Sequence, residues 1–186
     1  MAKLLYSASM SLDGFIAGPG GDMSWLSGYM GPNPLVDELI PDVGALLVGN
    51  RTFRGDDPYR DTPAEGKPFG GGWDGPQIVL THHTPAAPFP GVTFAGDLDT
   101  AVAAAKVAAG EKYVNVLGAD TARQCLAAGV LDEVLVSIAP VLLGAGTRLF
   151  EHPGGTHVRL ERIHLSGVPH ATNLWYRVSP ISARAC

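Results

Sequence analysis

The chain begins with an alternation of apolar and polar side chains that is typical of a β-strand. The alternating positions are Leu4, Tyr6 and Ala8 on one side and Lys3, Ser7 and Ser9 on the other. A period of two places the two sets on opposite faces, so the pattern predicts a strand over residues 3–10. Continuous apolar runs, by contrast, are typical of strands buried on both faces of a parallel sheet. Such runs and further short strand patterns cover residues 44–49, 77–81, 92–95, 113–117 and 132–139.

Helices are predicted in three places. Apolar stripes with helical spacing cover residues 97–109 and 119–128, and a glycine follows each of them. A shorter helix is expected over residues 33–40, because Asn33 is a favoured N-cap residue and Pro34 suits the first helical position.

The order of these elements predicts an α/β fold. Strands that alternate with helices favour a largely parallel sheet with helices on both faces. Residues 157–165 and 172–179 alternate in polarity and are predicted to form an antiparallel hairpin, which makes the sheet mixed. Glycine and proline interrupt residues 54–76 without a period, so this segment is predicted to be a long loop. No linker or repeat divides the 186 residues, and a single domain over residues 1–186 is expected.

The distribution of charge argues against nucleic acid and membranes as partners. The net charge is −5 and Lys and Arg form no run, whereas nucleic-acid binding normally needs a basic stripe. No apolar stretch approaches the roughly 18 residues that cross a bilayer, and the first residues lack the pattern of a signal peptide. We therefore expect a cytoplasmic protein in which Cys125 and Cys186 do not form a disulfide.

No single motif identifies the chemistry. The sequence lacks the phosphate-binding GxxxxGK[ST] loop, a GxGxxG that opens a helix, and the GxSxG nucleophile turn. It also lacks the CxxC and HExxH spacings of metal sites, so no metal is expected. Candidate residues are therefore sought at the carboxyl ends of the predicted strands, where open parallel sheets bind their ligands.

Three strand ends carry residues suited to a phosphate-bearing ligand. At the first, Gly49 permits a close backbone approach, Arg51 offers a cation and Thr52 offers a hydroxyl group. At another, Gly118 leads into a helix whose first amide groups are free to bind an anion. The other residues at these ends are Asn50, then Thr81, His82 and His83, and then Ala119, Asp120 and Thr121. Taken singly, each of these glycines is more often present only for the geometry of the turn, but three such strand ends at one end of a sheet favour a ligand site.

Two acidic positions admit a structural or a chemical role. Asp13 follows the first strand and precedes Gly14, and Asp56 and Asp57 precede Pro58 in the long loop. Asp before Gly or Pro is typical of turns. The residues by themselves therefore leave both roles open.

Several stretches form a specific combination in a fixed order. They are ASMSLDGFIA at 8–17, Trp25, GNRT at 49–52, DDP at 56–58, GAD at 118–120, LDE at 131–133, APVLLGAG at 139–146 and LF at 149–150. Together they resemble the reductase domain of the bifunctional deaminase–reductase of riboflavin biosynthesis, and more broadly the dihydrofolate reductase superfamily. The resemblance implies a dihydrofolate reductase-like mixed sheet of about eight strands, with helices on both faces. It also implies a homodimer.

The resemblance further implies NADPH as the hydride donor. Residues 49–52, 81–83 and 118–121 would hold this cofactor, with Arg51 or Asn50 near the adenosine 2′-phosphate. The substrate would be a small planar heterocycle of pteridine or pyrimidine type, reduced at a C=N or C=O bond. The activity would resemble that of 5-amino-6-(5-phosphoribosylamino)uracil reductase or of dihydrofolate reductase.

The same resemblance implies residues that face the substrate. Asp13 would be the catalytic residue that orients or protonates it, and a proton donor near neutral pH requires a raised pKa. Trp25 and Asp57 would contact the substrate beside the nicotinamide. Asp37 or Glu38 would lie where dihydrofolate reductases carry an acid, on the helix after the first loop.

Two other interpretations stay open. The chain could be a non-catalytic ligand-binding protein on the same scaffold, because a fold does not fix a function. It could also be a reductase that uses a deazaflavin in place of NADPH. The loop over residues 54–76 would either cover the site or pack against a second subunit.

Overall fold

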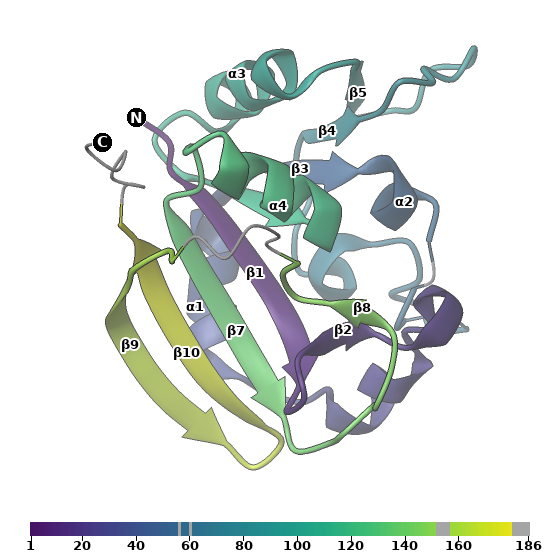
Figure 1. Cartoon of the computed structure of the whole chain (residues 1–186). Helices are drawn as coiled ribbons and strands as arrows, with labels where there is room; N and C mark the ends of the chain where they lie inside the picture. Colours follow the sequence, from purple (N-terminus) through teal and green to yellow (C-terminus); the bar gives the residue numbers. More distant parts are fainter. Residues whose placement is uncertain (56, 60, 152–156, 180–186) are drawn as a thin grey trace.

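An eight-stranded mixed sheet runs through the middle of the molecule. Its strands are β1 (Leu4–Ser11), β3 (Val43–Gly49), β4 (Gln77–Leu80), β5 (Val92–Ala95), β6 (Tyr113–Leu117), β7 (Glu133–Ala139), β9 (Leu160–Val168) and β10 (Ala171–Val178). They lie in the order β5-β4-β3-β6-β1-β7-β10-β9 (Figure 1). The strands from β5 to β7 are parallel to one another, and β10 and β9 continue the sheet as antiparallel strands at one edge. This computed structural model describes residues 1–55, 57–59, 61–151 and 157–179.

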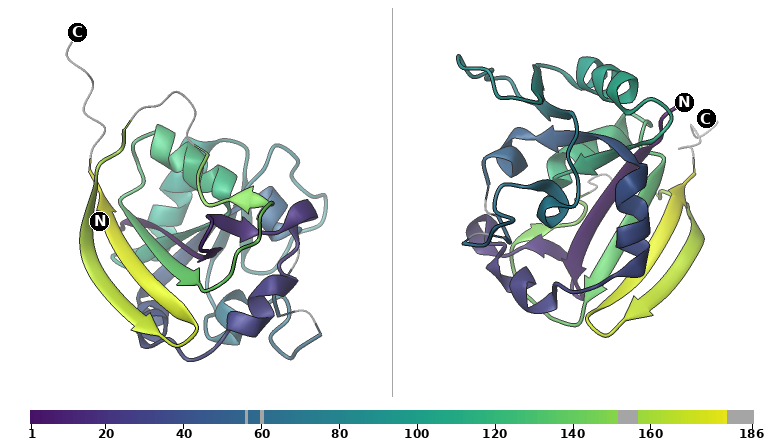
Figure 2. Two further views of the ribbon diagram at one scale, coloured as in Figure 1. Left: turned by 60° about the horizontal axis from the view of Figure 1, so that its bottom comes forward. Right: turned by 180° about the vertical axis from the view of Figure 1, so that it is seen from behind.

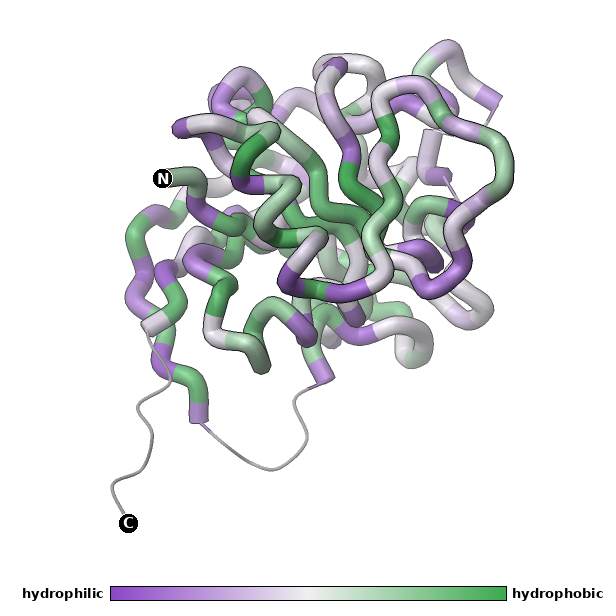
Figure 3. Tube along the Cα trace, turned by 90° about the horizontal axis from the view of Figure 1, so that it is seen from above, coloured by the Kyte–Doolittle hydropathy of each residue, from purple (hydrophilic) through white to green (hydrophobic). Residues whose placement is uncertain are grey.

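The first strand is more deeply buried than its alternating pattern predicts. Leu4, Leu5 and Tyr6 are each at most 1% exposed, although only one face was expected to be buried. The reason is the position of β1, which pairs with β6 on one side and β7 on the other. Both faces of its first half therefore lie in the core. The hydrophobic segments gather in the middle of the molecule in Figure 3, and the hydrophilic ones lie around them.

Helices cover both faces of the sheet, as the sequence predicts. On one face lie α3 (Leu98–Ala109) and α4 (Ala119–Ala127), whose buried residues join the core around Leu4 and Tyr6. On the other face lies α1 (Pro34–Leu39), visible from behind in the right view of Figure 2. The predicted cap of α3 is confirmed, because the Asp97 carboxylate accepts a hydrogen bond of 2.8 Å from the Thr100 amide. Among the described residues, no helix is long and apolar enough to cross a membrane.

The start of α1 is held by a buried amide pair. Asn33 precedes the helix as predicted, but its side chain does not cap it. Instead, the Asn33 and Asn173 side-chain amides donate to each other's oxygen over 3.0 Å in both directions. The Ser137 hydroxyl also donates to Asn173 Oδ1, over 2.8 Å. These bonds fasten the beginning of α1 to β7 and to the C-terminal hairpin.

Short elements that the hydrophobic pattern did not predict complete the fold. A second, two-stranded antiparallel sheet joins β2 (Phe15–Ala17) to β8 (Thr147–Arg148). The remaining elements are α2 (Asn50–Phe53) and the 3-10 helices η1 (Pro19–Gly21), η2 (Ser24–Tyr29), η3 (Ile40–Asp42) and η4 (Pro68–Gly71). The loop that contains η4 is attached to the start of β3, because Trp73 Nε1 donates to the Val43 carbonyl over 2.8 Å.

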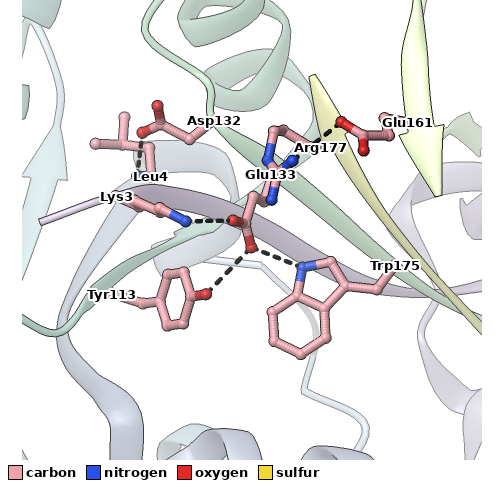
Figure 4. A network of polar contacts seen from close by, with 8 residues as sticks. All are labelled: Lys3, Leu4, Tyr113, Asp132, Glu133, Glu161, Trp175 and Arg177. Atoms are coloured by element: carbon pink, nitrogen blue, oxygen red, sulfur yellow. Dashed lines mark hydrogen bonds and ion pairs between the residues drawn. The ribbon is translucent and has the colours of Figure 1, made fainter. Parts of the chain in front are cut away.

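A buried carboxylate ties together the amino-terminal ends of the central strands (Figure 4). Glu133 begins β7 and is 1% exposed. It accepts hydrogen bonds from Lys3 at 2.8 Å, Trp175 Nε1 at 2.9 Å and the Tyr113 hydroxyl at 3.2 Å. Burial, followed by the charge of Glu133, raises the pKa of Tyr113 to about 12, so Tyr113 stays a neutral donor. This network stabilises the end of the sheet where the parallel strands begin, opposite to their carboxyl ends.

Candidate functional site

The second half of β1 is accessible although the strand lies in the middle of the sheet. Ser7, Ala8, Ser9 and Met10 are all partly exposed, and β1 is the fifth of eight strands. Successive side chains point to opposite faces. Ser7 and Ser9 share the α1 side with Leu5, and Ala8 and Met10 lie on the α3–α4 side. The part of the sheet that a ligand can approach is therefore the carboxyl-terminal end of its central strand.

A cleft of about 540 Å³ opens near these strand ends. It is lined by Gly18, Pro19, Gly20, Gly21, Arg51, Gly55, Gly146 and Thr147. Glycine brings the backbone to the surface of the cleft and leaves room for a ligand to lie against it. Arg51 is the charged side chain in this lining. Its guanidinium group has no hydrogen-bond or ion-pair partner within the described ranges.

Two turns beside the cleft interlock through glycine and threonine. A Cβ atom on Gly49 would come within 2.5 Å of Thr121 Oγ1, and one on Gly118 would collide with Thr52 Oγ1. Each glycine thus makes room for the other turn's threonine. We call residues 49–52 and 118–121 the paired turns. The sequence predicted them separately, and the structure brings them into contact because β3 and β6 are neighbours.

The paired turns have the properties of an anion site. Thr121 is 2% exposed, and neither its hydroxyl group nor that of Thr52 has a hydrogen-bond partner in the described part of the chain. Gly118 precedes α4, a nine-residue helix whose first amide groups carry partial positive charge. Backbone N–H groups and hydroxyl groups that converge at a helix start are suited to phosphate oxygens.

The charged and polar neighbours of the paired turns are mostly committed elsewhere. Asp120 accepts from Arg123 at 2.6 Å and from Gln124 at 2.8 Å, so its carboxylate lies along its own helix. The hydrogen bond from Arg123, then that from Gln124, lowers the pKa of Asp120, and the charge of Arg51 acts in the same direction. Asn50 Oδ1 accepts from Arg54 over 3.1 Å. Ala119 begins α4.

The third predicted strand end lies next to the paired turns. β4 pairs with β3, and Leu80 lies opposite Gly49. Thr81 follows β4 and is buried, and its hydroxyl oxygen accepts from the His83 amide over 3.1 Å. His82 and His83 are exposed. All three predicted stretches therefore lie together at the carboxyl ends of the neighbouring strands β4, β3 and β6.

Asp13 is a strongly bound carboxylate. Its Oδ1 accepts from the Ser11 hydroxyl at 2.6 Å and the Leu143 amide at 3.0 Å, and its Oδ2 accepts from the Gly144 amide at 2.7 Å. The bond from Ser11, followed by those from the two amides, lowers the pKa of Asp13 from its ordinary 3.8 to about 2. A general acid at neutral pH needs the opposite shift. The geometry gives Asp13 a positioning role, because it fastens the loop after β7 to the end of β1.

This arrangement predicts a pH effect on stability. A carboxylate whose pKa is depressed on folding stabilises the protein above the unfolded-state pKa and loses this contribution as the pH falls through the folded-state pKa. Asp13 should therefore stabilise the fold above pH 3.8 and lose that effect toward pH 2. Thermal unfolding of the wild type and Asp13→Asn at pH 5, 3 and 2 measures it. The difference between their melting temperatures should shrink as the pH falls, and a constant difference would contradict the assignment.

The other residues predicted to contact the substrate, Trp25 and Asp57, differ in whether they have a hydrogen-bonding group available for a ligand. Trp25 lies in η2 and packs against Tyr29, and its indole N–H is buried with no partner among the described residues. Both Asp57 oxygens accept from amides of the same loop, those of Tyr59 and Gly66. Trp25 thus offers a donor, whereas the bonds of Asp57 fold its own loop. Asp56 lies outside the described residues.

The acids of α1 do not face the sheet. Asp37 and Glu38 are exposed, and the side of α1 that packs against the core carries Leu35 and Leu39. The expectation that one of the two acids takes the place of the dihydrofolate reductase acid is wrong. The helix has only six residues, and its inward positions are filled by leucine.

Sequence reasoning missed several residues of this region. The cleft wall formed by residues 18–21 and by Gly146 and Thr147 was not singled out, although the run Gly-Pro-Gly-Gly is a usable signal for exposed backbone. Ser7 and Asn115 were also missed, because an isolated polar residue in an apolar strand gives no indication of its partner. Among the described residues, no three His, Cys, Asp or Glu side chains converge on a point that could hold a metal ion.

Solved structures of other proteins share this fold. A protein of Shewanella sp. PV-4 assigned to riboflavin biosynthesis has a TM-score of 0.73 and 24% identity, over 96% of this chain and 99% of that chain. The diaminohydroxyphosphoribosylaminopyrimidine deaminase/5-amino-6-(5-phosphoribosylamino)uracil reductase of Thermotoga maritima has a TM-score of 0.70 and 16% identity, over 96% and 57%. Dihydrofolate reductase of Enterococcus faecalis, complexed with NADP(H), has a TM-score of 0.61 and 18% identity, over 95% and 96%. The predicted dihydrofolate reductase-like fold is therefore confirmed.

The sequence itself identifies the family. A search of curated proteins finds no match. The model of the RibD C-terminal domain, however, matches residues 2–171, which include the paired turns and all the strands up to the final hairpin. The chain belongs to the RibD C-terminal domain family.

Proposed function

We propose that the protein is an NADPH-dependent reductase that transfers a hydride to a small planar heterocycle of pteridine or pyrimidine type. The observation that carries the proposal is the pair of interlocking turns, whose helix start and two threonine hydroxyl groups lie beside a glycine-lined cleft. Neither hydroxyl group has a hydrogen-bond partner in the part of the chain that the structure describes. The family supports it, as does the likeness to a dihydrofolate reductase complexed with NADP(H).

The residues present fit a phosphate-bearing dinucleotide. Because Gly49 and Gly118 lack a Cβ atom, the Thr121 and Thr52 hydroxyl groups pack against their backbones and hold the two turns side by side, so that both turns can face one pyrophosphate. The hydroxyl groups of Thr52 and Thr121 would donate to its oxygens. Arg51, whose guanidinium group has no hydrogen-bond or ion-pair partner among the described residues, would bind the 2′-phosphate that distinguishes NADPH from NADH. Residues 81–83 would border the adenosine.

The protein's part in catalysis is to bind, align and exclude water. Bound NADPH supplies the hydride. Asp13 holds the loop after β7 against the end of β1 and so positions one wall of the site. Trp25 offers its buried indole N–H to an acceptor atom of the substrate. Alignment of this kind lowers the barrier by fixing donor and acceptor at reacting distance.

A titration with NADPH, followed by tryptophan fluorescence, tests the proposal, with NADH as the comparison. The wild type should bind NADPH saturably and more tightly than NADH. Arg51→Ala should weaken NADPH binding by at least about tenfold and leave NADH binding unchanged, because a charge-assisted hydrogen bond contributes roughly 1.5–3 kcal/mol. Arg177→Ala, on β10 in an ion pair with Glu161, is the control and should bind both nucleotides like the wild type.

The alternatives predict other outcomes of the same titration. No binding of either nucleotide would overturn the proposal. Binding of a deazaflavin in its place would favour a reductase with that hydride carrier. If the protein binds NADPH but no pteridine or pyrimidine causes oxidation of the NADPH, followed by its absorbance at 340 nm, a non-catalytic binding protein is favoured.

A homodimer is also proposed. β9 forms an open edge of the sheet, and Leu160, Ile163 and Leu165 on it are exposed. An open edge strand with apolar side chains is suited to pairing with another chain. Light scattering coupled to gel filtration should give twice the mass of one chain, and a monomeric mass at micromolar concentration would contradict the dimer.

A further inference from the structure

We propose that Ser7 and Asn115 form a recognition pair for the lactam edge of a neutral ring, in which a C=O group lies next to an N–H group. Ser7 would accept from the ring and Asn115 would donate to it. The inference rests on the proposed function, because the ring would be the substrate. It assigns the specificity of the α1 side of the site to these two residues.

The pair crosses two neighbouring strands. Ser7 lies on β1 and Asn115 on β6, where Asn115 is paired in register with Leu5. The Ser7 hydroxyl donates to Asn115 Oδ1 over 2.8 Å. Ser7 is partly exposed and belongs to the accessible half of β1, whereas Asn115 is 0% exposed. Ser7 is therefore the exposed member of the pair, and Asn115 lies buried directly beside it.

The hydrogen bond fixes what each side chain still offers. A hydroxyl group has one hydrogen, and that of Ser7 is used on Asn115, so Ser7 Oγ offers only lone pairs to a ligand. Asn115 Nδ2 carries two N–H donors, and it is buried with no partner among the described residues. A buried donor without an acceptor is rare and costs free energy. A ligand oxygen that accepts from Nδ2 would remove this cost.

The surrounding strands favour an uncharged ligand. Within their bounds, β1 and β6 carry no charged residue, and β7 carries only Glu133, which is level with Leu5 and Asn115 and is already paired with Lys3. The next residues on this face are also neutral: Ser9 lies opposite Ser137, which lies opposite Asn173. A carboxylate buried here would be repelled by Glu133, and an ammonium group would find no unpaired counter-charge on these strands, because Glu133 is already paired with Lys3. One acceptor beside one donor complements an N–H beside a C=O.

Two probes separate this proposal from a structural role. Uracil presents neutral lactam edges, whereas protonated 2,4-diaminopyrimidine presents two adjacent donors. Affinities are measured by NMR titration of the ¹⁵N-labelled full chain, which also follows the side-chain amide signal of Asn115. The wild type should prefer uracil, and this signal should shift on binding.

Two variants test the two halves of the pair. Ser7→Ala removes the acceptor and should weaken uracil binding about tenfold. Asn115→Asp keeps an oxygen for the Ser7 hydroxyl but replaces the donor with a second acceptor. It should weaken uracil binding and strengthen binding of protonated 2,4-diaminopyrimidine, so that the preference between the probes reverses.

Controls keep each outcome decisive. Tyr113→Phe, on the same face of β6, removes a hydroxyl group that bonds to Glu133 and should leave the preference unchanged. All variants should bind NADPH like the wild type. The recognition pair is overturned if Asn115→Asp keeps the preference of the wild type for uracil. If Asn115→Asp does not fold, an unchanged uracil affinity in Ser7→Ala overturns it. A wild type that binds neither probe also overturns it. If the wild type prefers uracil but does not bind NADPH, the proposed function is overturned and the recognition pair is not.

Discussion

Replacing Glu133 with alanine is expected to lower the free energy of unfolding by about 3 kcal/mol, because removing a buried carboxylate leaves the donors around it without an acceptor. The variant would leave the indole N–H of Trp175 and the hydroxyl group of Tyr113 without their acceptor. Lys3 is half-exposed and can turn to solvent, so most of the loss comes from the two ring donors. Urea unfolding followed by tryptophan fluorescence measures the change.

Two further variants show whether burial is the cause. Glu133→Gln keeps one oxygen acceptor with the same shape and should lose less than Glu133→Ala. Glu161→Ala removes the exposed ion pair with Arg177, in which the two side chains are 63% and 51% exposed, and should cost less than about 1 kcal/mol. Equal losses for Glu133→Ala and Glu161→Ala would show that the network in Figure 4 does not stabilise the sheet.

Gly118→Ala is expected to weaken NADPH binding by at least about a hundredfold, which corresponds to 2.7 kcal/mol or more. Gly118 has a φ of +101°, which an alanine adopts only with strain. Its Cβ atom would also collide with Thr52 Oγ1 and push that hydroxyl group out of the paired turns. Both the backbone amide at the start of α4 and the Thr52 hydroxyl would then be displaced from a bound phosphate.

Gly49 and Gly129 separate the two causes. Gly49→Ala keeps an ordinary φ of −73°, and its Cβ atom would collide with Thr121 Oγ1, so it tests the collision without the backbone strain. Gly129→Ala has a φ of +70° and nothing within 4 Å of its Cβ atom, so it tests the strain far from the turns. Fluorescence titration should show weakened NADPH binding for Gly49→Ala and unchanged binding for Gly129→Ala. Unchanged binding in Gly118→Ala would remove the paired turns from the cofactor site.

Much of the sheet can be predicted because its strands are buried. The apolar runs at 77–81, 113–117 and 132–139 match β4, β6 and β7 to within one residue at each end. The hairpin was also predicted, although its strands begin and end a few residues away from the expected positions. The spacing of apolar residues is a local property of a sequence, so a single chain is enough to predict these strands.

The remaining features depend on partners far away along the chain. β2 and β8 have three and two residues, too few to show any period, and each exists only through the other. Asn33 looked like a helix cap, but its side chain is held by Asn173. The pKa of Asp13 is lowered partly by amides some 130 residues later, so its local Asp–Gly sequence gave no sign of the direction of the shift.

The position of β1 has a consequence for how the chain folds during synthesis. β1 is made well before its partners in the sheet, which are residues 114–116 of β6 and 133–139 of β7. At a translation rate of about 5–20 residues per second, Leu4, Leu5 and Tyr6 wait several seconds or more for those strands. The contact order around β1 is therefore high, which slows folding. Until β7 leaves the ribosome, this apolar segment is the part of the nascent chain that a chaperone would have to shield from aggregation.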